Sequence, residues 1–343
     1  MELDARKLGI LKAIIDEYIM SASPVGSRAI SKHEQFNLSS ATIRNEMADL
    51  EELGYLEQPH TSAGRVPSDK AYRLYVDQMM QKAALTDDEI RIIRAHMSAK
   101  LDEVESVMKH TAQALSAVTN YTAMALPPML ASNRLRHIQL VPLREGRALV
   151  VIVTTAGFAR DAIIRVPEDI RSDELERISH ILTQRFYDCR MDQISECIAR
   201  EMSGEIYERR AFLCSVVEAI EKKMEPDSPN VQLSGATNML HYPEYADMNK
   251  AKSFLAAVEG RSMLYEMLKR ASKLEFTITI GNENPDEMFK DCSIVTATYQ
   301  IGEEPLGSFG IIGPTRMNYG KVISVLEYMR RSLSEMLTND LDE

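Results

Sequence analysis

The sequence predicts an α+β multidomain protein, and three observations point to that class. With 343 residues, the chain exceeds what a single hydrophobic core normally organises. Short helical patterns fill its first part and end in a turn-rich hairpin. Further along, strand-like runs are joined by short turns, which indicates antiparallel sheet rather than parallel βαβ units. We therefore expect a small N-terminal unit followed by an antiparallel-sheet domain.

The overall composition is that of a globular protein. Hydrophobic residues make up 45% of the chain and charged residues 27%. No apolar run approaches the roughly 20 residues that a membrane-spanning helix needs. The chain begins Met1-Glu-Leu-Asp, unlike the basic start of a signal peptide. These features predict a cytoplasmic protein without membrane contact.

Motifs for enzymatic or metal chemistry are missing from the sequence. The four cysteines share no metal-finger spacing and are expected to be reduced thiols: Cys189, Cys197, Cys214 and Cys292. The histidines are scattered, and no Gly-x-Ser-x-Gly nucleophile elbow is present. Gly307, Gly310 and Gly313 lie in an extended run that matches neither a phosphate loop nor a dinucleotide-binding motif. We predict no enzyme activity, no cofactor and no metal.

The first helix is predicted by apolar residues that recur at three- and four-residue spacing. They are Leu8, Leu11, Ile14, Ile15, Tyr18 and Ile19. Pro24 disfavours helical geometry in the residue before it and so ends this helix. Ser27 is a suitable N-cap for a second short helix that reaches about residue 34, and Ser39 or Ser40 can cap a third.

The third helix, over about 40–53, separates a core face from an outer face. Its core face is apolar and comprises Ile43, Met47 and Leu50. Its outer face carries small and hydrogen-bonding residues, namely Ala41, Asn45 and Ala48, flanked by Thr42 and Arg44. Alanines allow close approach to base-pair edges, while Asn45 can pair with adenine and Arg44 with guanine or a phosphate. This pattern favours a DNA-reading helix, although an ordinary solvated face would look the same in isolation.

A hairpin directly after the third helix favours the DNA-reading interpretation. It runs Tyr55-Leu-Glu-Gln, then a polar tip Pro59-His-Thr-Ser-Ala-Gly, then Arg65-Val-Pro. Helices and a wing in this order predict a winged helix-turn-helix domain. Arg65, at the root of the wing, could enter the minor groove or clamp a phosphate. We interpret His60 at the tip as a polar loop residue rather than a pH switch.

The formal net charge of −11 opposes this interpretation, because DNA-binding domains are usually basic. Affinity for phosphates depends on a local surface, however, and cations gather in the N-terminal region. Acidic residues such as Glu46 and Asp49 are interleaved with them, so their charges have to be kept away from the DNA backbone. The predicted DNA-binding residues are Arg28, Lys32, Ser40, Ala41, Thr42, Arg44, Asn45, Ala48, His60, Arg65 and Lys70.

The rest of the chain is predicted to begin with a long helix over 86–125 that has a heptad-like apolar rhythm. This helix would either pack on the sheet of its own domain or form a coiled coil between chains. Strands and helices are then expected at about 138–143, 148–155, 158–166, 172–187, 276–281, 294–301 and 306–312, followed by a final amphipathic helix. The economical interpretation is one α+β domain split by a largely helical insertion.

Four stretches of the sequence carry a resemblance. Residues 39–70 read Ser39-Ser-Ala-Thr-Ile-Arg-Asn-Glu-Met-Ala-Asp-Leu-Glu-Glu-Leu-Gly-Tyr-Leu-Glu-Gln-Pro-His-Thr-Ser-Ala-Gly-Arg-Val-Pro-Ser-Asp-Lys. The other three are Leu240-His-Tyr-Pro-Glu-Tyr, Gly281-Asn-Glu-Asn-Pro and Leu306-Gly-Ser-Phe-Gly-Ile-Ile-Gly-Pro-Thr-Arg-Met. Together they closely resemble the bacterial heat-inducible transcription repressor HrcA family over essentially the whole chain. Ala71 departs from this pattern, which tends towards Gly there.

The resemblance implies a specific domain organisation. It comprises a winged-helix DNA-binding domain at 1–82, a linker helix at 83–125, a split GAF-like domain at 126–191 and 273–343, and an inserted dimerisation segment at 192–272. The fold class expected is thus α+β multidomain, with a GAF-like antiparallel-sheet domain interrupted by a mostly helical inserted segment.

The resemblance also implies a function. We expect a homodimer that represses heat-shock (chaperone) operons by binding an inverted-repeat operator in double-stranded DNA. Its activity would depend on temperature and on the chaperonin GroEL. One alternative is a metabolite-responsive winged-helix regulator with an effector bound in the GAF-like domain. An enzyme with a DNA-binding appendage lacks a catalytic constellation, and a pure scaffold would leave the outer face of the third helix unexplained.

Overall fold

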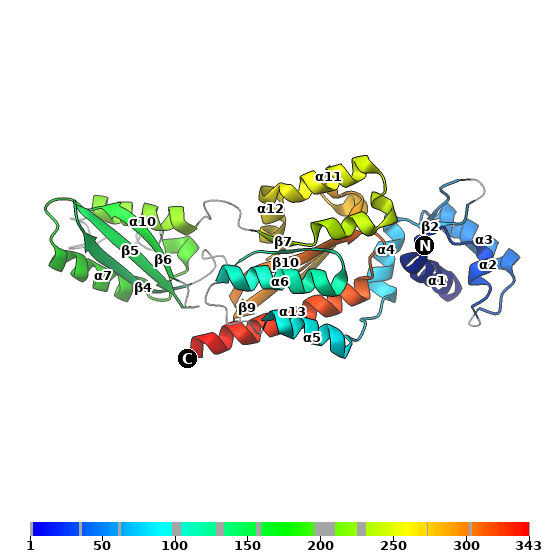
Figure 1. The fold of residues 1–343 in the computed structure, drawn as a ribbon, viewed down its shortest axis with the longest axis horizontal. Coiled ribbons are helices and arrows are strands. Elements are labelled where there is room, and N and C mark those ends of the chain that lie inside the picture. Colours follow the sequence, from blue (N-terminus) through cyan, green and yellow to red (C-terminus); the bar gives the residue numbers. More distant parts are fainter. Residues whose placement is uncertain are drawn as a thin grey trace.

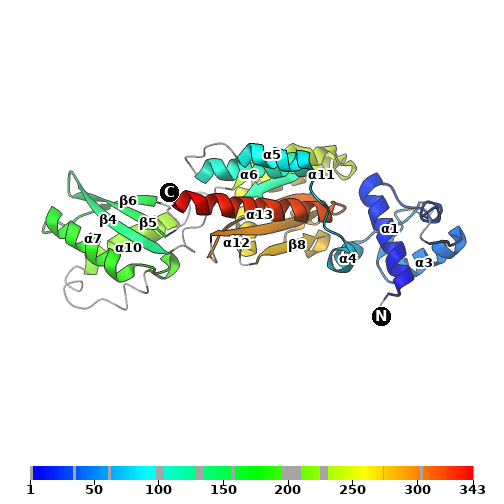
Figure 2. The same cartoon turned by 90° about the horizontal axis from the view of Figure 1, so that it is seen from below.

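The computed structural model describes most of the chain: 3–33, 36–60, 63–97, 104–127, 134–155, 159–194, 196, 210–224, 231–272, 274–301 and 304–342. The elements form three units along an elongated molecule (Figure 1). We call them the N-terminal unit (3–79), the central unit (87–127 and 231–342) and the insert unit (134–224). Figure 2 shows the central unit between the other two.

The N-terminal unit contains three helices and a small hairpin, in the predicted order. They are α1 (Ala5–Ser21), α2 (Ser27–Ile30), α3 (Ser40–Glu52), β1 (Leu56–Glu57) and β2 (Val66–Pro67), followed by α4 (Asp69–Leu74) and the π-helical turn η1 (Tyr75–Met79). Side chains of Asp4, Ser39 and Ser68 cap α1, α3 and α4 by accepting backbone N–H bonds. Ser27 is the first residue of α2 rather than its cap, and α2 ends earlier than predicted.

The hairpin is extended by a short pairing with the chain before α2. The backbone N–H groups of Val25 and Arg65 donate to each other's carbonyls over 2.8 and 2.9 Å. A Cβ at Gly64 would lie 2.5 Å from the Val25 backbone, so only glycine permits this close approach. The segment before α2 and the hairpin are therefore held together.

The central unit is built on a five-stranded antiparallel sheet in the order β7-β3-β10-β9-β8. Its strands are β3 (Thr122–Ala125), β7 (Gln232–Ser234), β8 (Phe276–Ile280), β9 (Cys292–Ile301) and β10 (Glu304–Pro314). One face packs against α6 (Val104–Thr119) and α13 (Tyr319–Asp342), with α5 (Asp87–Met97) beside them. The other face packs against α11 (Met248–Glu259) and α12 (Arg261–Ala271), as Figure 1 shows.

The insert unit has its own sheet and its own hydrophobic core. The sheet is antiparallel and consists of β4 (Leu135–Leu143), β5 (Arg147–Thr154) and β6 (Ala159–Arg165). In the described part of the chain, α7 (Ser172–Phe186) and α10 (Arg210–Met224) both contribute to the single core that covers one face of this sheet. The short 3-10 turn η3 (Met191–Gln193) follows α7.

The observed grouping of strands differs from the predicted domain division. Residues 126–191 were expected to share a sheet with 273–343, but their strands form the separate sheet of the insert unit. The central sheet is completed instead by β3 and β7, and α11 and α12 cover it although they lie within 192–272. Local patterns identify strands and hairpins, but they do not state which sheet a hairpin joins.

The predicted long helix over 86–125 is also different in the structure. It corresponds to α5, α6 and strand β3, and residues 98–103 lie outside the described part. All four residues of β3 are buried, so the strand lacks the alternation that marks a half-exposed strand. None of the described helices combines the length and apolar character that a membrane span requires.

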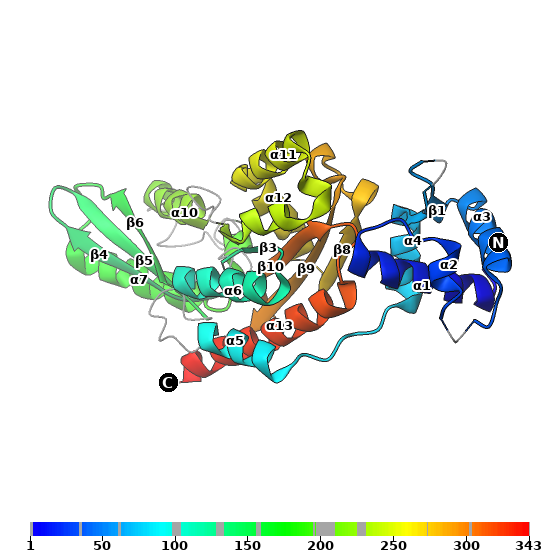
Figure 3. The same ribbon diagram turned by 45° about the vertical axis from the view of Figure 1, so that its right-hand side comes forward.

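The N-terminal unit is docked on the central unit through two charged contacts. In one, Arg73 binds both carboxylate oxygens of Glu283, and its Nη2 donates to the Ile278 carbonyl over 2.7 Å. In the other, the buried Arg316 pairs with Glu244 and donates from Nη1 to the Ile19 carbonyl over 3.1 Å. Figure 3 shows α1 and α4 beside the β8 edge of the central sheet.

Next to the contact between Arg73 and Glu283, the Asp69 side chain of the N-terminal unit closely approaches Gly281 and Asn282. The Asp69 carboxylate accepts from the Asn282 backbone N–H over 2.9 Å and from its side-chain amide over 2.8 Å. Gly281 has φ +52°, and a Cβ there would collide with that carboxylate. The stretches at 240–245, 281–285 and 306–317 thus each contribute a residue to the junction between the two units.

Candidate nucleic-acid interface

The third helix is placed by its apolar face and by its cap. Ile43, Met47 and Leu50 are buried in the core of the N-terminal unit. The Ser39 hydroxyl accepts from the Thr42 N–H over 3.1 Å and lies 2.9 Å from the Thr42 hydroxyl. The Ser27 and Ser40 hydroxyls are 3.0 Å apart, which links α2 to the first turn of α3. Helix α3 is therefore anchored by its buried face, its cap and the contact with α2.

The outer face of α3 is open to solvent. Ala41, Arg44 and Asn45 are exposed, and Ala48 is half-buried. Figure 1 places α2 and α3 at the end of the molecule farthest from the insert unit. We call the line Ala41, Asn45 and Ala48 the α3 ridge. Its small residues leave room for a base-pair edge, and Asn45 presents an amide that can bond one.

The predicted basic residues differ in whether they are exposed or engaged in contacts within the N-terminal unit. Arg28 and Lys32 are exposed at the end of α2, and His60 is exposed near the hairpin tip, whose residues 61 and 62 lie outside the described part. Lys70 instead donates to the Leu53 carbonyl over 2.8 Å and lies 4.3 Å from the Tyr55 ring centroid. Lys70 thus has a structural role that the sequence did not indicate.

Arg65 is also engaged within the N-terminal unit. Its Nε donates a hydrogen bond to Glu51 Oε2 over 2.8 Å, and its Nη2 lies 2.7 Å from the same oxygen. The side chain is only 19% exposed. It lies at the root of the hairpin as predicted, but the free cation expected there is paired with the last turn of α3.

Two cations that sequence reasoning missed lie beside α3. The Lys7 Nζ is 2.9 Å from a carboxylate oxygen of Glu46 and 2.9 Å from one of Asp49. Arg6 Nη1 lies 3.6 Å from the other oxygen of Glu46. Both cations come from the first turn of α1, some forty residues away in sequence. No local pattern predicts such a pairing, although two basic residues at a helix N-terminus are electrostatically unfavourable there and invite an outside partner.

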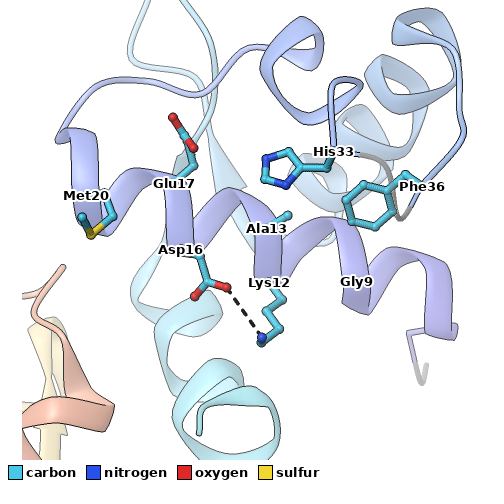
Figure 4. Close-up of a pocket in the computed structure, with 8 residues that line it drawn as sticks. All are labelled: Gly9, Lys12, Ala13, Asp16, Glu17, Met20, His33 and Phe36. Carbon is cyan, nitrogen blue, oxygen red and sulfur yellow. Dashed lines mark ion pairs between the residues drawn. The ribbon is translucent and has the colours of Figure 1, made fainter. Parts of the chain in front are cut away.

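A surface cavity of about 460 Å³ lies along α1, away from the α3 ridge. Figure 4 shows its lining residues: Gly9, Lys12, Ala13, Asp16, Glu17, Met20, His33 and Phe36. Lys12 and Asp16 pair across 3.6 Å, and the Tyr75 hydroxyl donates to Asp16. These mixed apolar and charged side chains form no catalytic arrangement. Among the described residues, no group of three or more His, Cys, Asp or Glu could hold a metal ion.

The glycines of the C-terminal motif are structural. Gly307, Gly310 and Gly313 lie within strand β10, so they cannot form a phosphate-binding loop between a strand and a helix. At Gly310, a Cβ would lie 2.8 Å from the Thr296 side chain on the neighbouring strand. Tight contact inside the sheet accounts for glycine at this position.

An exposed helix of small and hydrogen-bonding residues, held at the free end of a mixed α/β chain, is the arrangement of a DNA-binding transcription regulator. Residues 105–323 match the family model described as HrcA protein C terminal domain. The chain belongs to the HrcA family of heat-inducible transcription repressors. Members of this family are transcription repressors and not enzymes.

Relatives match over the full chain. The heat-inducible transcription repressor HrcA of Ruminiclostridium cellulolyticum is 43% identical, covering 100% of this chain and 99% of that protein. The repressor of the same name from Brevibacillus brevis is 42% identical, covering 99% and 100%. A crystal structure of a hypothetical protein solved at 2.2 Å resolution is 24% identical with a TM-score of 0.62, covering 98% and 99%, which shows a shared fold.

Proposed function

We propose that this protein represses chaperone operons by binding an inverted-repeat operator as a homodimer, with the α3 ridge in the major groove. The observation that carries the proposal is the exposure of Ala41 and Asn45 on a helix whose other side is fixed in a core. Relatives at about 40% identity are named heat-inducible transcription repressors, which supports the class of genes controlled.

The N-terminal unit would act as a winged helix. Helix α3 would enter the major groove, with Asn45 on adenine and Arg44 on guanine or a phosphate. The exposed Arg28 and Lys32 at the end of α2 would bind the flanking phosphates. The hairpin around His60 would lie against the adjacent backbone, in the position of a wing.

The dimer would form through the open face of the insert sheet. On that face, Val141, Leu149 and Ile163 lie side by side across the three strands. Val141 is 39% exposed and Ile163 is 59% exposed, while the opposite face is covered by the core of α7 and α10. Adjacent exposed apolar side chains of this kind mark interaction surfaces.

The charges around Ile163 suit a two-fold contact. Asp161 and Arg165 lie two residues before and two residues after Ile163, on the same face of β6. A two-fold axis that passes at Ile163, perpendicular to the strand, would place Asp161 against Arg165 of the second copy, and the reverse. The proposed dimer contact is thus in β4–β6 and not in the segment 192–272 that was expected to carry it.

Temperature would act on the population of folded dimer. The central sheet combines strands from 122–125, 232–234 and 276–314, and such non-local contacts form slowly. A chain of this topology is a suitable client for GroEL, and heat would reduce the DNA-competent dimer faster than GroEL restores it. The central unit would be the GAF-like domain that the resemblance implies.

A second candidate function is regulation by a small effector bound in the central unit. The Thr277 and Thr296 hydroxyls are buried and have no hydrogen-bond partner in the part of the chain that the structure describes. They lie on paired positions of β8 and β9, on the side covered by α11 and α12. A polar ligand could satisfy both. A saturable rise in the melting temperature on addition of a small molecule would distinguish this function from repression without an effector.

Footprinting on the promoter of a chaperone operon, repeated at two salt concentrations, tests the proposed function. We expect two protected half-sites related by a two-fold axis, with affinity that falls steeply as salt increases. Equal binding to a scrambled duplex of the same length would contradict sequence-specific repression. A single protected half-site bound by a monomer would contradict the dimer.

A further inference from the structure

The acidic residues of α3 flank the ridge on both sides. Asp49 lies four residues after Asn45, hence one turn further along the same side of the helix, and Glu46 follows Asn45 directly. Glu51 lies on the opposite flank, seven residues and so about two turns beyond Arg44. Each of these carboxylates would come near DNA phosphates if α3 entered a groove.

On each flank, a cation from another element pairs with the acidic residues. On the Asn45 flank, the Lys7 ammonium bridges Glu46 and Asp49 at 2.9 Å from each. On the Arg44 flank, Arg65 pairs with Glu51. Lys7 comes from α1 and Arg65 directly precedes β2, so both pairings exist only in the folded unit. The tertiary structure therefore changes the charge that α3 presents.

Lys7 is held in this position by the start of α1. Its backbone N–H donates to the Asp4 carboxylate over 2.8 Å, which caps the helix. Its side chain is 20% exposed, and the Glu46 side chain is 13% exposed. Hydrogen bonds to Glu46 and Asp49 raise the pKa of Lys7 above its ordinary value, so the ammonium stays charged at neutral pH.

We propose that Lys7 is a positioning residue for DNA binding, which offsets one of the two negative charges of Glu46 and Asp49 so that the α3 ridge can approach the phosphate backbone. This inference rests on the proposed function. Lys7 acts through the two carboxylates and not by binding a phosphate itself, because its ammonium is already shared between them. An acidic chain thus presents a helix whose flanking acids carry less net negative charge towards DNA.

The test compares Lys7→Met with the same substitution in a chain that also carries Glu46→Gln and Asp49→Asn. Binding is measured on the inverted-repeat duplex and on a scrambled duplex of equal length, at two salt concentrations. Lys7→Met alone should weaken binding to both duplexes by roughly fivefold per half-site, the effect of one uncompensated charge about 4 Å from another in water. In the Glu46→Gln, Asp49→Asn background, the same substitution should change affinity by less than about twofold per half-site.

Lys12→Met is the matched control, because Lys12 is a cation on the same helix that pairs with Asp16 rather than with α3. It should leave DNA affinity unchanged. Glu46→Gln with Asp49→Asn alone, which keeps Lys7, should bind DNA at least as tightly as wild type, since it removes the two carboxylates whose charge Lys7 offsets. This double variant tests whether the two carboxylates oppose DNA binding even when Lys7→Met does not fold.

The binding data for Lys7→Met and for wild type contradict the role of Lys7 and the proposed function separately. An equal loss of affinity from Lys7→Met in both backgrounds would overturn the inference and make Lys7 a direct phosphate contact. No loss from Lys7→Met, with operator specificity intact, would overturn it as well. A wild-type protein that does not distinguish the operator from the scrambled duplex would contradict the proposed function, whatever Lys7→Met does.

Discussion

Arg65 and Glu51 form an ion pair that ties the hairpin to the last turn of α3, with the Arg65 Nε 2.8 Å and Nη2 2.7 Å from one carboxylate oxygen. Because two guanidinium nitrogens converge on that oxygen, the orientation of the Arg65 side chain is restricted. The hairpin and α3 are thereby coupled where both would meet DNA. Any effect of Arg65 on binding includes an effect on Glu51.

Arg65→Ala should weaken binding to all DNA sequences. The substitution removes a cation at the root of the hairpin and leaves the Glu51 carboxylate uncompensated. The logarithm of affinity should fall less steeply with the logarithm of salt concentration, by about one unit per lost phosphate contact and so about two per dimer. Titrations at several salt concentrations measure this slope. Glu51→Gln is the comparison variant, and it should bind at least as tightly as wild type; an unchanged slope for Arg65→Ala would exclude the hairpin from the interface.

Ile163→Glu should dissociate the dimer. It places a charge at the centre of the apolar strip on the open face of the insert sheet, where two copies are expected to meet. Sedimentation velocity over a range of concentrations measures the shift from dimer to monomer. Arg160→Glu is the control, because Arg160 is also exposed on β6 but alternates to the other face. A variant that remains dimeric at low concentration would place the contact elsewhere, for instance on α5 and α6.

Tyr72→Phe should stabilise the protein. Tyr72 is 1% exposed at the junction of α4 and α13, and its hydroxyl has no hydrogen-bond partner among the residues that the structure describes. Removing an unsatisfied buried hydroxyl should raise the free energy of unfolding by about 1 kcal/mol.

Denaturant unfolding measures the free energy of unfolding of both variants, and Tyr299→Phe is the comparison for Tyr72→Phe. The buried Tyr299 hydroxyl donates to the Leu126 carbonyl over 2.8 Å, so its loss leaves that carbonyl with one bond fewer. Tyr299→Phe should lower the free energy of unfolding by about 1 kcal/mol. If both variants lost stability equally, the Tyr72 hydroxyl would have a partner, such as a bound water.

The docking of the N-terminal unit should weaken in acid. Partial burial raises the pKa of Glu283, but hydrogen bonds from Arg73 and from the Ile280 N–H outweigh it, so the pKa lies below its ordinary value of 4.5. A carboxylate with a lowered pKa stabilises the folded state above that ordinary value, and the contribution is lost as pH falls through the lowered pKa. Hydrogen exchange of the 69–73 backbone amides as a function of pH measures this weakening of the docking.

Glu283→Gln should remove this pH dependence. The variant should exchange faster than wild type at neutral pH, and the two proteins should converge in acid, where the wild-type carboxyl is protonated. Glu287→Gln is the control, because the ion pair of Glu287 is a local one with Lys290, over 2.6 Å. Parallel pH profiles for wild type and Glu283→Gln would show that Arg73 and Glu283 do not govern the docking.

The N-terminal unit was predictable because its information is local. Apolar spacing located α1 and α3, and Ser39, one of the two candidate caps with Ser40, is the cap in the structure. The α3 ridge followed from the same periodicity, since burial of Ile43, Met47 and Leu50 fixes which side faces solvent. Caps and periodicity act within a few residues, so they can be read from sequence.

The partition of strands and the charge pairing of α3 were not predictable in this way. Strand β3 is short and entirely buried, and β7 has three residues in a turn-rich stretch, so neither carries an alternating pattern. Lys7 meets Glu46 and Asp49, and Arg65 meets Glu51, only because the chain folds back on itself. Long-range pairing of this kind leaves no periodic signal.

The most direct test of the central claim is binding of wild type and Asn45→Ala to a library that contains every single-base substitution of the operator. Gln78→Ala, an exposed polar change in η1, is the control. We predict that Asn45→Ala relaxes discrimination by roughly 1–3 kcal/mol at one position in each half-site and leaves the other positions unchanged. Wild-type discrimination retained at every position would contradict base reading by the α3 ridge.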